Sequence, residues 1–255
     1  MLWLSSIGAV ALCARSLLLG PVPLWVAALS FAAYLGLALV GVLVPQLEMF
    51  GDVESRGDAT TGGVALTFDD GPHPETTRRV LRILAGAGAT ATFFVLGEKV
   101  ERHPDVVKDI VSAGHSIGVH GHRHHRLYAL LPPAAVAADI ARASRAVEAA
   151  CGARPRWFRP PVGQVSPRTS AGARRAGLPI VAWSVRGRDG LRGADAKRVA
   201  ARIARGLAPG AIVLLHDAAE RDDFVPASIA ALPEVLSAIR AKGLRVLGLD
   251  ELISS

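Results

Sequence analysis

Residues 64–71 read Val-Ala-Leu-Thr-Phe-Asp-Asp-Gly, an apolar run that ends abruptly on two adjacent acids and a glycine. The apolar part is typical of a buried strand. Two carboxylates side by side at the end of such a strand lose hydration and repel each other, unless a cation or a proton-transfer role separates them. Asp69 and Asp70 are therefore the first candidates for a functional site. The alternative is an Asp-Gly turn in which one carboxylate caps a helix that begins near Pro74.

Strand-like apolar runs and helix-like segments alternate from residue 62 onwards. Strands are predicted at 64–69, 91–96, 116–119, 156–159, 179–185, 211–215 and 244–249. Helices are predicted at 75–86, 98–113, 133–151, 167–176, 195–207 and 226–241. This alternation favours right-handed β-α units around a parallel sheet, open or closed into a barrel. Residues 62–255 are therefore predicted to form one α/β domain.

Several polar residues fall at the ends of these predicted strands. They are Asp69 and Asp70 after the first strand, His120 after the third, Arg159 after the fourth, Asp189 beyond the fifth and His216 after the sixth. Because the carboxyl ends of parallel strands meet at one face of the sheet, we expect these side chains to lie close together.

The histidines indicate a metal site. Five of the eight lie between His115 and His125. His120 and His124 are four residues apart, so a helical turn would place both imidazoles on one side. With one carboxylate of the Asp69-Asp70 pair they would form a two-histidine, one-carboxylate site, for which zinc is the first choice and nickel, cobalt or iron(II) also suit the ligands. The alternative is a surface patch of histidines.

Two further motifs are suited to a site. Residues 158–163, Phe-Arg-Pro-Pro-Val-Gly, form a rigid extended turn that carries an arginine, although a stiff loop with a solvated arginine fits equally well. Residues 212–217, Ile-Val-Leu-Leu-His-Asp, read as a buried strand that ends in a histidine. A histidine there suits a proton donor in a cleft, and the alternative is a satisfied histidine at a strand end.

The N-terminal segment is predicted to be a membrane anchor. Residues 1–45 contain one charged residue, Arg15, and the uncharged run Leu24–Val44 has 21 residues, close to the roughly 20 that cross a bilayer. The run Leu2–Leu19 is also apolar, so the anchor has one or two transmembrane helices. Arg15 is expected to stay in the cytoplasm, which places the catalytic domain outside it. Residues 46–61 are predicted to be a polar linker.

The charge pattern argues against a nucleic-acid partner. The net charge is +7, but the arginines are scattered along helical segments and aromatic residues make up only 5%. We interpret the charge as a solvated surface that suits an anionic membrane or wall polymer. Cys13 and Cys151 lie in different regions and indicate no disulfide framework.

Taken in order, four motifs resemble those of the polysaccharide deacetylase family, carbohydrate esterase family four, with its chitooligosaccharide deacetylase homology domain. They are residues 67–71, 118–125, 159–163 and 214–216, and the resemblance covers roughly residues 62 to 252. It implies a distorted (β/α) barrel of about seven strands. It also implies removal of N- or O-acetyl groups from sugars with a divalent metal, Zn2+ first and Co2+ or Ni2+ as alternatives.

The resemblance implies a role for each matching residue. The implied metal ligands are Asp70, His120 and His124. The implied catalytic residues are Asp69 as general base, Arg159 as the group that orients and ionises it, His216 as general acid and Asp189 as partner of His216. The implied substrate-binding residues are Leu214 at the acetyl methyl, Val162 with a backbone N–H for the oxyanion, and Trp183.

The chain departs from the family pattern at three positions. Val162 stands where the family often has tyrosine, which removes a ring contact to the sugar. Arg186 stands where many members place the acid that tunes the catalytic histidine, so Asp189 is expected to take over that role for His216. Gly190 replaces a frequent tryptophan. The substrate groove is therefore expected to differ in shape from that of chitin and peptidoglycan enzymes.

These patterns predict a membrane-anchored, metal-dependent deacetylase that acts on an acetylated glycan outside the cytoplasm. A deacylase or deformylase of a lipid-linked sugar is the close alternative, which the membrane segment and altered groove keep open. A non-catalytic carbohydrate-binding protein on the same fold is the third reading. The joint presence of a base, a metal triad and an acid counts against the last.

Overall fold

Strand β2 (Gly63–Asp69) lies at the centre of a parallel sheet. The computed structural model describes residues 10, 14–18 and 20–253. All seven residues of β2 are buried, because the strand runs between β3 (Thr92–Val95) and β7 (Ala211–His216) and helices cover the sheet. The pairing register places Asp69 opposite His216 on one side and Phe94 on the other. The first acid of the opening motif therefore ends the central strand beside the last histidine.

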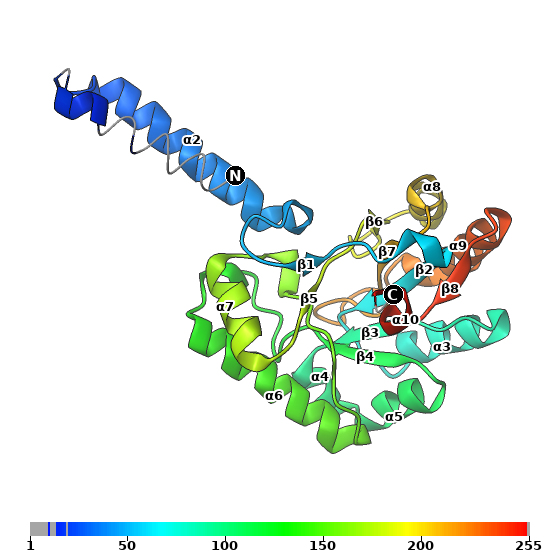
Figure 1. The fold of residues 1–255 in the computed structure, drawn as a ribbon. Helices are drawn as coiled ribbons and strands as arrows, with labels where there is room; N and C mark the ends of the chain where they lie inside the picture. The colour runs from blue at the N-terminus through cyan, green and yellow to red at the C-terminus, as the bar shows by residue number, and fades with distance from the viewer. Residues whose placement is uncertain (1–9, 11–13, 19, 254–255) are drawn as a thin grey trace.

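The strands form an incomplete barrel (Figure 1). Five strands follow the order β4 (Ser116–Val119), β3, β2, β7 and β6 (Val185–Arg186), and β8 (Arg245–Leu247) pairs with the start of β2. A second ladder joins β1 (Val53–Glu54) to β5 (Ile180–Val181). Single bridges at Phe158 connect β4 to β5. All ladders between these strands are parallel, so the predicted parallel-strand α/β fold is confirmed.

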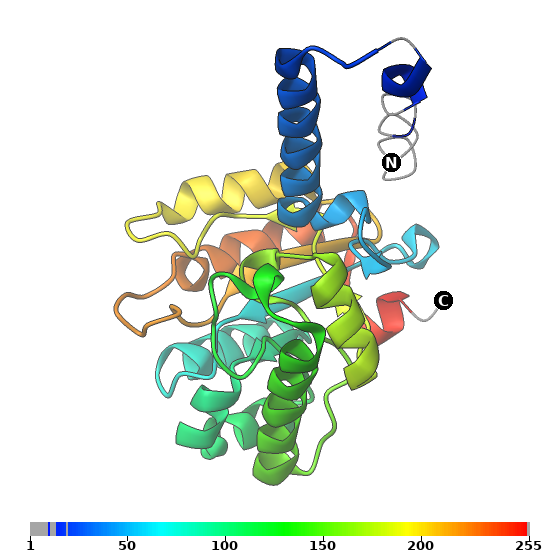
Figure 2. The ribbon, with the colours of Figure 1, turned by 90° about the vertical axis from the view of Figure 1, so that its left-hand side faces the viewer.

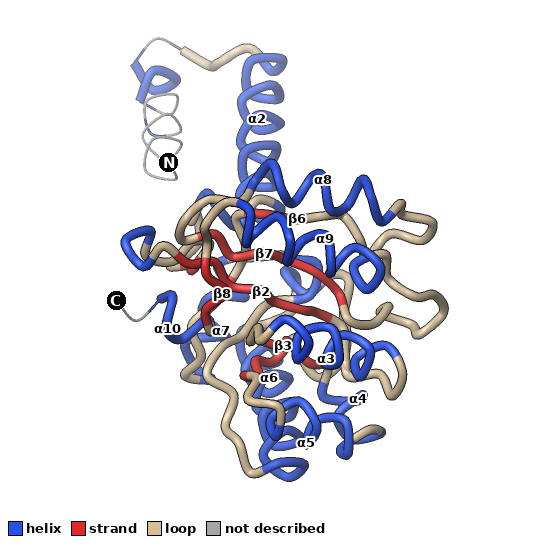
Figure 3. The backbone as a smooth tube through the Cα atoms, turned by 90° about the vertical axis from the view of Figure 1, so that its right-hand side faces the viewer, coloured by secondary structure: helices blue, strands red, loops and turns tan. Residues whose placement is uncertain are grey.

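Helices surround the strands. The described helices of the domain are α3 (Thr76–Ala87), α4 (Gly97–Arg102), α5 (Pro104–Ser112), α6 (Pro133–Cys151), α7 (Pro167–Ala176), α8 (Ala196–Gly206), α9 (Ser228–Ala241) and α10 (Leu249–Ile253). Four short 3-10 turns are η1 (Pro45–Leu47), η2 (Ala59–Thr61), η3 (Tyr128–Leu130) and η4 (Pro161–Gly163). Figure 3 shows α8 and α9 on one side of the strands and α3 to α6 on the other. Both layers bury their apolar faces against the sheet.

Three predicted elements were wrong in detail. The single helix predicted at 98–113 is two helices, because Pro104 disfavours helical backbone at His103, where φ is −132°. The strand predicted at 156–159 contributes only the bridge at Phe158. The strand predicted at 179–185 is broken into β5 and β6.

The segment predicted as a linker is packed on the domain. It carries η1, β1 and η2, and Val53 is buried. The Gly57 N–H donates to the Gly210 carbonyl at 2.9 Å, and the Asp58 N–H donates to the Leu252 carbonyl at 2.9 Å. These partners lie about 150 and 190 residues away along the chain. No local pattern in the sequence indicates such contacts. The division of the chain into anchor, linker and domain remains a prediction.

One apolar helix projects from the domain (Figure 2). Helix α2 (Leu24–Leu43) has 20 residues and an apolar sequence, so it is long and apolar enough to cross a membrane. It is exposed along nearly all of its length. Its end is tied to the domain by two hydrogen bonds. The Val165 N–H donates to the Val42 carbonyl at 3.1 Å, and Gln46 Nε2 donates to the Trp183 carbonyl at 2.8 Å. Most of the run Leu2–Leu19, and Cys13 within it, lie outside the described residues.

Candidate active site

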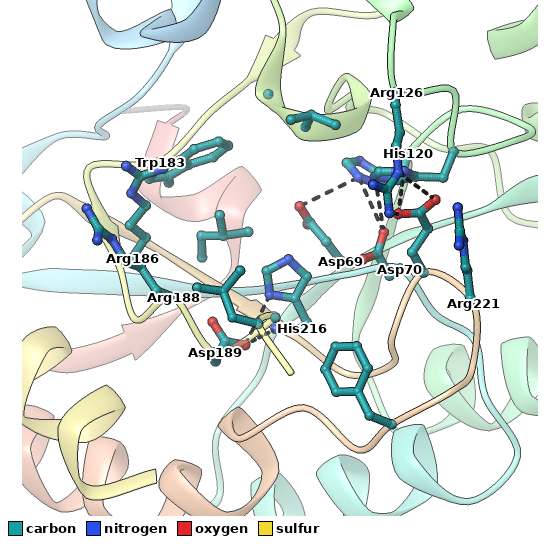
Figure 4. Close-up of a pocket in the computed structure, with 18 of the residues that line it drawn as sticks. Asp69, Asp70, His120, Arg126, Trp183, Arg186, Arg188, Asp189, His216 and Arg221 are labelled. Atoms are coloured by element: carbon teal, nitrogen blue, oxygen red, sulfur yellow. Dashed lines mark hydrogen bonds and ion pairs between the residues drawn. The ribbon is translucent and has the colours of Figure 1, made fainter. Parts of the chain in front are cut away.

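A pocket of about 670 Å³ opens at the carboxyl ends of the strands (Figure 4). The structure brings all ten predicted site residues to it. Nine line the pocket: Asp69, Asp70, His120, His124, Val162, Trp183, Asp189, Leu214 and His216. The tenth, Arg159, is fully buried directly behind Asp69.

Arg159 fixes the position of Asp69. Its Nη1 donates to Asp69 Oδ1 at 2.7 Å and to Thr67 Oγ1 at 2.8 Å, and its Nη2 donates to the Ala182 carbonyl at 2.7 Å. The guanidinium also lies over the Phe94 ring, 4.1 Å from the ring centroid. Burial lowers the pKa of Arg159, and the adjacent Asp69 charge opposes that shift. One carboxylate oxygen of Asp69 is therefore held, and the other faces the pocket.

Asp70 and the two histidines form a compact group of ligand atoms. Asp70 Oδ1 lies 3.6 Å from His120 Nε2 and 3.7 Å from His124 Nε2, and all three atoms lie within 4.8 Å of one another. Asp70 Oδ1 is buried and has no hydrogen-bond partner among the described residues. A buried carboxylate oxygen without a donor is costly, and a cation at this point would satisfy it. The donor set of one carboxylate and two imidazoles fits a divalent transition metal.

The tautomer of His120 agrees with a metal site. Its Nδ1 lies 2.8 Å from the Arg159 carbonyl, which can only accept, so Nδ1 carries the proton. The lone pair is then on Nε2, which faces Asp70. Burial lowers the pKa of His120 against the opposing charges of Asp69 and Asp70, which favours the neutral ring that a metal requires.

The expected helical turn between the two histidines was wrong. Residues 120–125 form no helix, and the chain turns at Gly121, where φ is +85°. This left-handed conformation suits glycine. The turn brings the rings of His120 and His124 to a centroid distance of 5.3 Å. The two rings lie together as the spacing predicts, but a loop brings them together instead of a helical turn.

His216 and Asp189 form a second pair of interacting side chains in the pocket, at the end of β7. Asp189 Oδ2 accepts from the His216 backbone N–H at 2.7 Å and lies 3.1 Å from His216 Nδ1. Nδ1 therefore carries a proton, and Nε2 is free to exchange one within the pocket. Burial lowers the pKa of His216, but the Asp189 charge and hydrogen bond outweigh it and raise the pKa to about 10. This contact supports the prediction that Asp189 takes the tuning role in place of the acid missing at Arg186.

The sequence of residues 56–181 matches the family model of polysaccharide deacetylases. A chitooligosaccharide deacetylase from Bradyrhizobium sp. (strain ANU 289) is 36% identical over 221 residues, a match that spans 81% of this chain and 98% of the relative. This chain belongs to the polysaccharide deacetylase family. The predicted family membership is confirmed.

Solved structures of the deacetylase family share the fold. A family 4 acetyl xylan esterase from Clostridium thermocellum, in complex with a cobalt ion, has a TM-score of 0.68 at 30% identity and covers 74% of this chain and 89% of its own. A family 4 pseudoenzyme from Bacillus anthracis has a TM-score of 0.70 at 27% identity, with 78% and 67% covered. Because the fold occurs in an enzyme and in a pseudoenzyme, activity must be argued from the residues of this pocket.

Glycine at position 190 leaves room for the His216 ring. A Cβ built on Gly190 would lie 2.9 Å from His216 Cε1 and Nδ1, closer than real Cβ contacts. Any larger side chain at this position would press on the imidazole that Asp189 holds. Val162 lies across the pocket with 51% of its surface exposed and with a φ of +59°. Such a conformation is strained for a β-branched residue, and strain of this kind collects at functional sites.

Asp217 and Glu220 were missed by the sequence analysis as site residues. Asp217 is buried behind the Asp69-Asp70 pair, where it accepts from the Thr77 hydroxyl. Its carboxylate fills the space that a Cβ on Gly71 would need. Burial raises the pKa of Asp217 to about 7, although the Thr77 hydrogen bond opposes the shift. Asp217 therefore supports the turn that carries Asp70.

Glu220 contacts the imidazole ring of His124, one of the candidate metal ligands. Its Oε2 lies 3.4 Å from His124 Nδ1 and 2.9 Å from Arg126 Nη2. Burial opposes ionisation of Glu220, but the Arg126 hydrogen bond and the neighbouring charges hold its pKa below the usual range. The Glu220 charge lies on the Nδ1 side of the His124 ring, and His124 Nε2 lies on the other side, 3.7 Å from Asp70 Oδ1.

Lys99 holds the loop that carries Glu220 in place. Lys99 of α4 is fully buried, and its Nζ donates to the Ala219 carbonyl at 2.7 Å and to Asp222 Oδ1 at 2.5 Å. A buried lysine with an acidic partner is costly to disrupt, because removal of one partner leaves a charge uncompensated. Lys99 therefore fixes residues 219–222 and, through them, the position of Glu220.

We expect Glu220→Gln to weaken metal binding while the fold is retained. The change removes the charge that orients His124, and loss of such a partner lowers metal affinity by roughly ten- to a hundredfold. Competition with a chromophoric chelator measures the dissociation constant for Zn2+. Asp223→Asn, on the same loop but paired with Arg192, is the matched control. Equal affinities within about twofold for both variants and the parent would show that Glu220 does not position His124.

Proposed function

We propose that the chain is a metal-dependent hydrolase that removes N-acetyl or O-acetyl groups from a cell-envelope polysaccharide or amino sugar. The observation that carries this proposal is the convergence of three units on one pocket. Asp69 is held by Arg159, Asp70 lies with two histidine nitrogens, and His216 is held by Asp189. A binding protein needs none of these pairings.

Asp70, His120 and His124 would hold the metal. When bound, a divalent cation supplies a Lewis acid at the acetyl carbonyl. Zinc suits the ligands best, and cobalt or nickel suit them as well. The cobalt ion in the acetyl xylan esterase structure supports this class of metal.

Asp69 and His216 divide the proton transfers between them. The free oxygen of Asp69 takes a proton from the attacking water, while Arg159 keeps the carboxylate in place. His216 Nε2 gives a proton to the sugar nitrogen as its bond to the acetyl carbon breaks. Water adds across that bond, so the products are acetate and a free amine. For an O-acetyl substrate the proton goes to the sugar oxygen.

Leu214, Val162 and Trp183 form the acetyl end of the pocket in this proposal. Leu214 and Trp183 are each 7% exposed and offer an apolar wall for the acetyl methyl group. The strained turn at Val162 would present a backbone N–H to the oxygen that becomes negative in the transition state.

The alternative substrate is a lipid-linked sugar, which keeps the same chemistry with a different acyl group or carrier. The third reading, a non-catalytic protein, is supported by the pseudoenzyme among the structural relatives. Acetate release from acetylated chitooligosaccharide, peptidoglycan and lipid-linked sugars distinguishes the three readings. Turnover of the first two supports the proposal, turnover of the last alone favours the alternative, and no turnover by metal-loaded protein favours a binding role.

We also propose that α2 anchors the protein in a membrane, with the catalytic domain outside the cytoplasm. Helix α2 has the length and apolar surface for one span, and Arg15 precedes it. The substrates of the proposed reaction lie on the same outer side. Protease added to sealed spheroplasts should digest the domain. If the domain stays intact while an external marker protein is digested, the orientation is the reverse.

A further inference from the structure

Four arginines line the pocket around the candidate catalytic residues. Figure 4 shows Arg186 and Arg188 beside Trp183 on one side, and Arg126 and Arg221 on the other. Asp69, Asp70 and His216 lie between the two groups. A substrate that reaches the catalytic residues must therefore pass close to guanidinium groups.

The acids of the pocket do not neutralise all of these arginines. Each acid in the lining already has a partner or an assigned cation: Asp69 with Arg159, Asp189 with His216, Glu220 with Arg126, Asp223 with Arg192, and Asp70 with the metal of the proposed function. Arg126 is therefore paired with Glu220. Arg192, which does not line the pocket, is paired with Asp223, with 2.5 Å between Arg192 Nη2 and Asp223 Oδ2. The remaining charge of the lining is carried by three arginines.

The side chains of Arg186, Arg188 and Arg221 make no hydrogen bond or ion pair within the part of the chain that the structure describes. All three are exposed. Arg221 follows Glu220 directly, but Glu220 is engaged by Arg126 and His124. These three guanidiniums therefore present free donors to whatever enters the pocket.

The backbone at Arg188 is a second, independent observation. Its φ is +61°, in the left-handed region that favours glycine. The chain has glycines at 187 and 190, and neither of them has a φ in the left-handed region. Instead an arginine occupies the unfavourable conformation and lines the pocket. Strained residues that persist at a site indicate a function for the side chain.

We propose that the acylated sugar bound by this pocket carries an anionic group, a phosphate or a carboxylate, which Arg186, Arg188 and Arg221 recognise. The planar guanidinium fork matches both oxyanions, and the two flanks allow the charge to be clamped from opposite sides. This inference rests on the proposed function for the identity of the reaction. A neutral acetylated sugar would leave the three arginines merely hydrated.

The test uses the full chain in detergent, loaded with Zn2+, and three forms of one disaccharide. The forms are neutral diacetylchitobiose, its reducing-end 1-phosphate and its reducing-end aldonate, so that the charge lies within one sugar ring of an acetamide. Calorimetry gives the dissociation constants, and acetate release gives kcat/KM. We expect the phosphate, the carboxylate or both to bind roughly tenfold or more tightly than the neutral form, the scale of one charge-assisted hydrogen bond. The preference should shrink as salt is raised.

The variants test which side chains are responsible. The combined change Arg186→Ala, Arg188→Ala and Arg221→Ala should reduce the ratio of charged to neutral affinity to about one, whereas the three corresponding changes to lysine should keep part of it. Arg175→Ala is the control, because Arg175 is exposed on α7 and does not line the pocket. Retention of the full preference in the alanine variant would overturn the inference.

The outcomes separate the inference from the proposed function. A preference for the phosphate alone points to a sugar phosphate such as a lipid carrier provides, and a preference for the carboxylate alone points to an acidic wall glycan. Tighter binding of a charged form, without acetate release from it or from any of the substrates named under the proposed function, would support the anion site and refute the hydrolase. Acetate release without any preference would refute the anion site alone. If the alanine variant loses only its binding to anionic lipid vesicles, the arginines contact the membrane and the inference is wrong.

Discussion

Replacement of Asp70 or His120 by alanine is expected to lower bound zinc from about one ion per chain to near zero, and to abolish acetate release with it. Both residues offer a buried atom to the proposed metal, and Asp70 Oδ1 has no hydrogen-bond partner in the described structure. Loss of either leaves two donors, too few to retain the ion against a chelator. Metal analysis of the purified full chain after dialysis measures the effect.

The histidine cluster supplies a control for this prediction. His125 belongs to the same run but is exposed and does not line the pocket, so His125→Ala should keep its zinc. Chelation followed by return of Zn2+ should restore the activity of the parent and of the control. Full metal occupancy in both site variants would disprove the assignment of the ligands.

Asp69→Asn and His216→Ala are each expected to lower turnover by roughly a hundredfold or more while the metal stays bound. The two residues end the neighbouring strands β2 and β7, and neither belongs to the group formed by Asp70, His120 and His124. Asp69→Asn should remove the acidic limb of the pH-rate profile, because the group that must be deprotonated is gone. His216→Ala should remove the alkaline limb, because the group that must be protonated is gone.

The alkaline limb should also respond to Asp189. The Asp189 carboxylate outweighs the effect of burial and raises the pKa of His216 to about 10. Asp189→Asn removes that charge, so the pKa falls, the imidazolium is lost at lower pH and the active range narrows from the alkaline side. The same pair stabilises the folded state below the unfolded pKa of about 6.5, and this contribution is lost as pH rises through about 10. An unchanged rate and profile in Asp189→Asn would show that Asp189 is not the partner of His216.

The functional residues at strand ends could be predicted from the sequence because buried parallel strands have a clear pattern of apolar residues. A continuous apolar run such as 64–68 must stop where polar groups reach the surface, and Asp69 stands at that boundary. The same logic located His216 at the end of β7. Helices α6 and α7 were predicted with their exact bounds, since Pro133 and Pro167 begin them and Gly152 and Gly177 follow them.

Contacts between loops that are far apart in the sequence have no comparable local pattern. Glu220 lies 94 residues from Arg126, and in the sequence it belongs to an ordinary charged loop. The support from Lys99 depends on α4 passing beneath that loop, which only the folded chain determines. Uncompensated charge at Arg186, Arg188 and Arg221 likewise emerges only after each acid has found its partner. Local periodicity predicts which residues are buried, and it does not predict which charges meet.

The proposed hydrolysis requires the combined action of Asp69 and a metal held by Asp70, His120 and His124. The most direct test incubates the full chain with acetylated chitooligosaccharide and measures acetate and free amine together, with zinc, after chelation, and in the Asp69→Asn variant with zinc. We expect equimolar acetate and amine from the zinc-loaded parent, none above background after chelation, and at most about a hundredth of the parent rate from the variant. Equal rates in all three samples, or no product from the zinc-loaded parent on any acetylated glycan, would contradict the account.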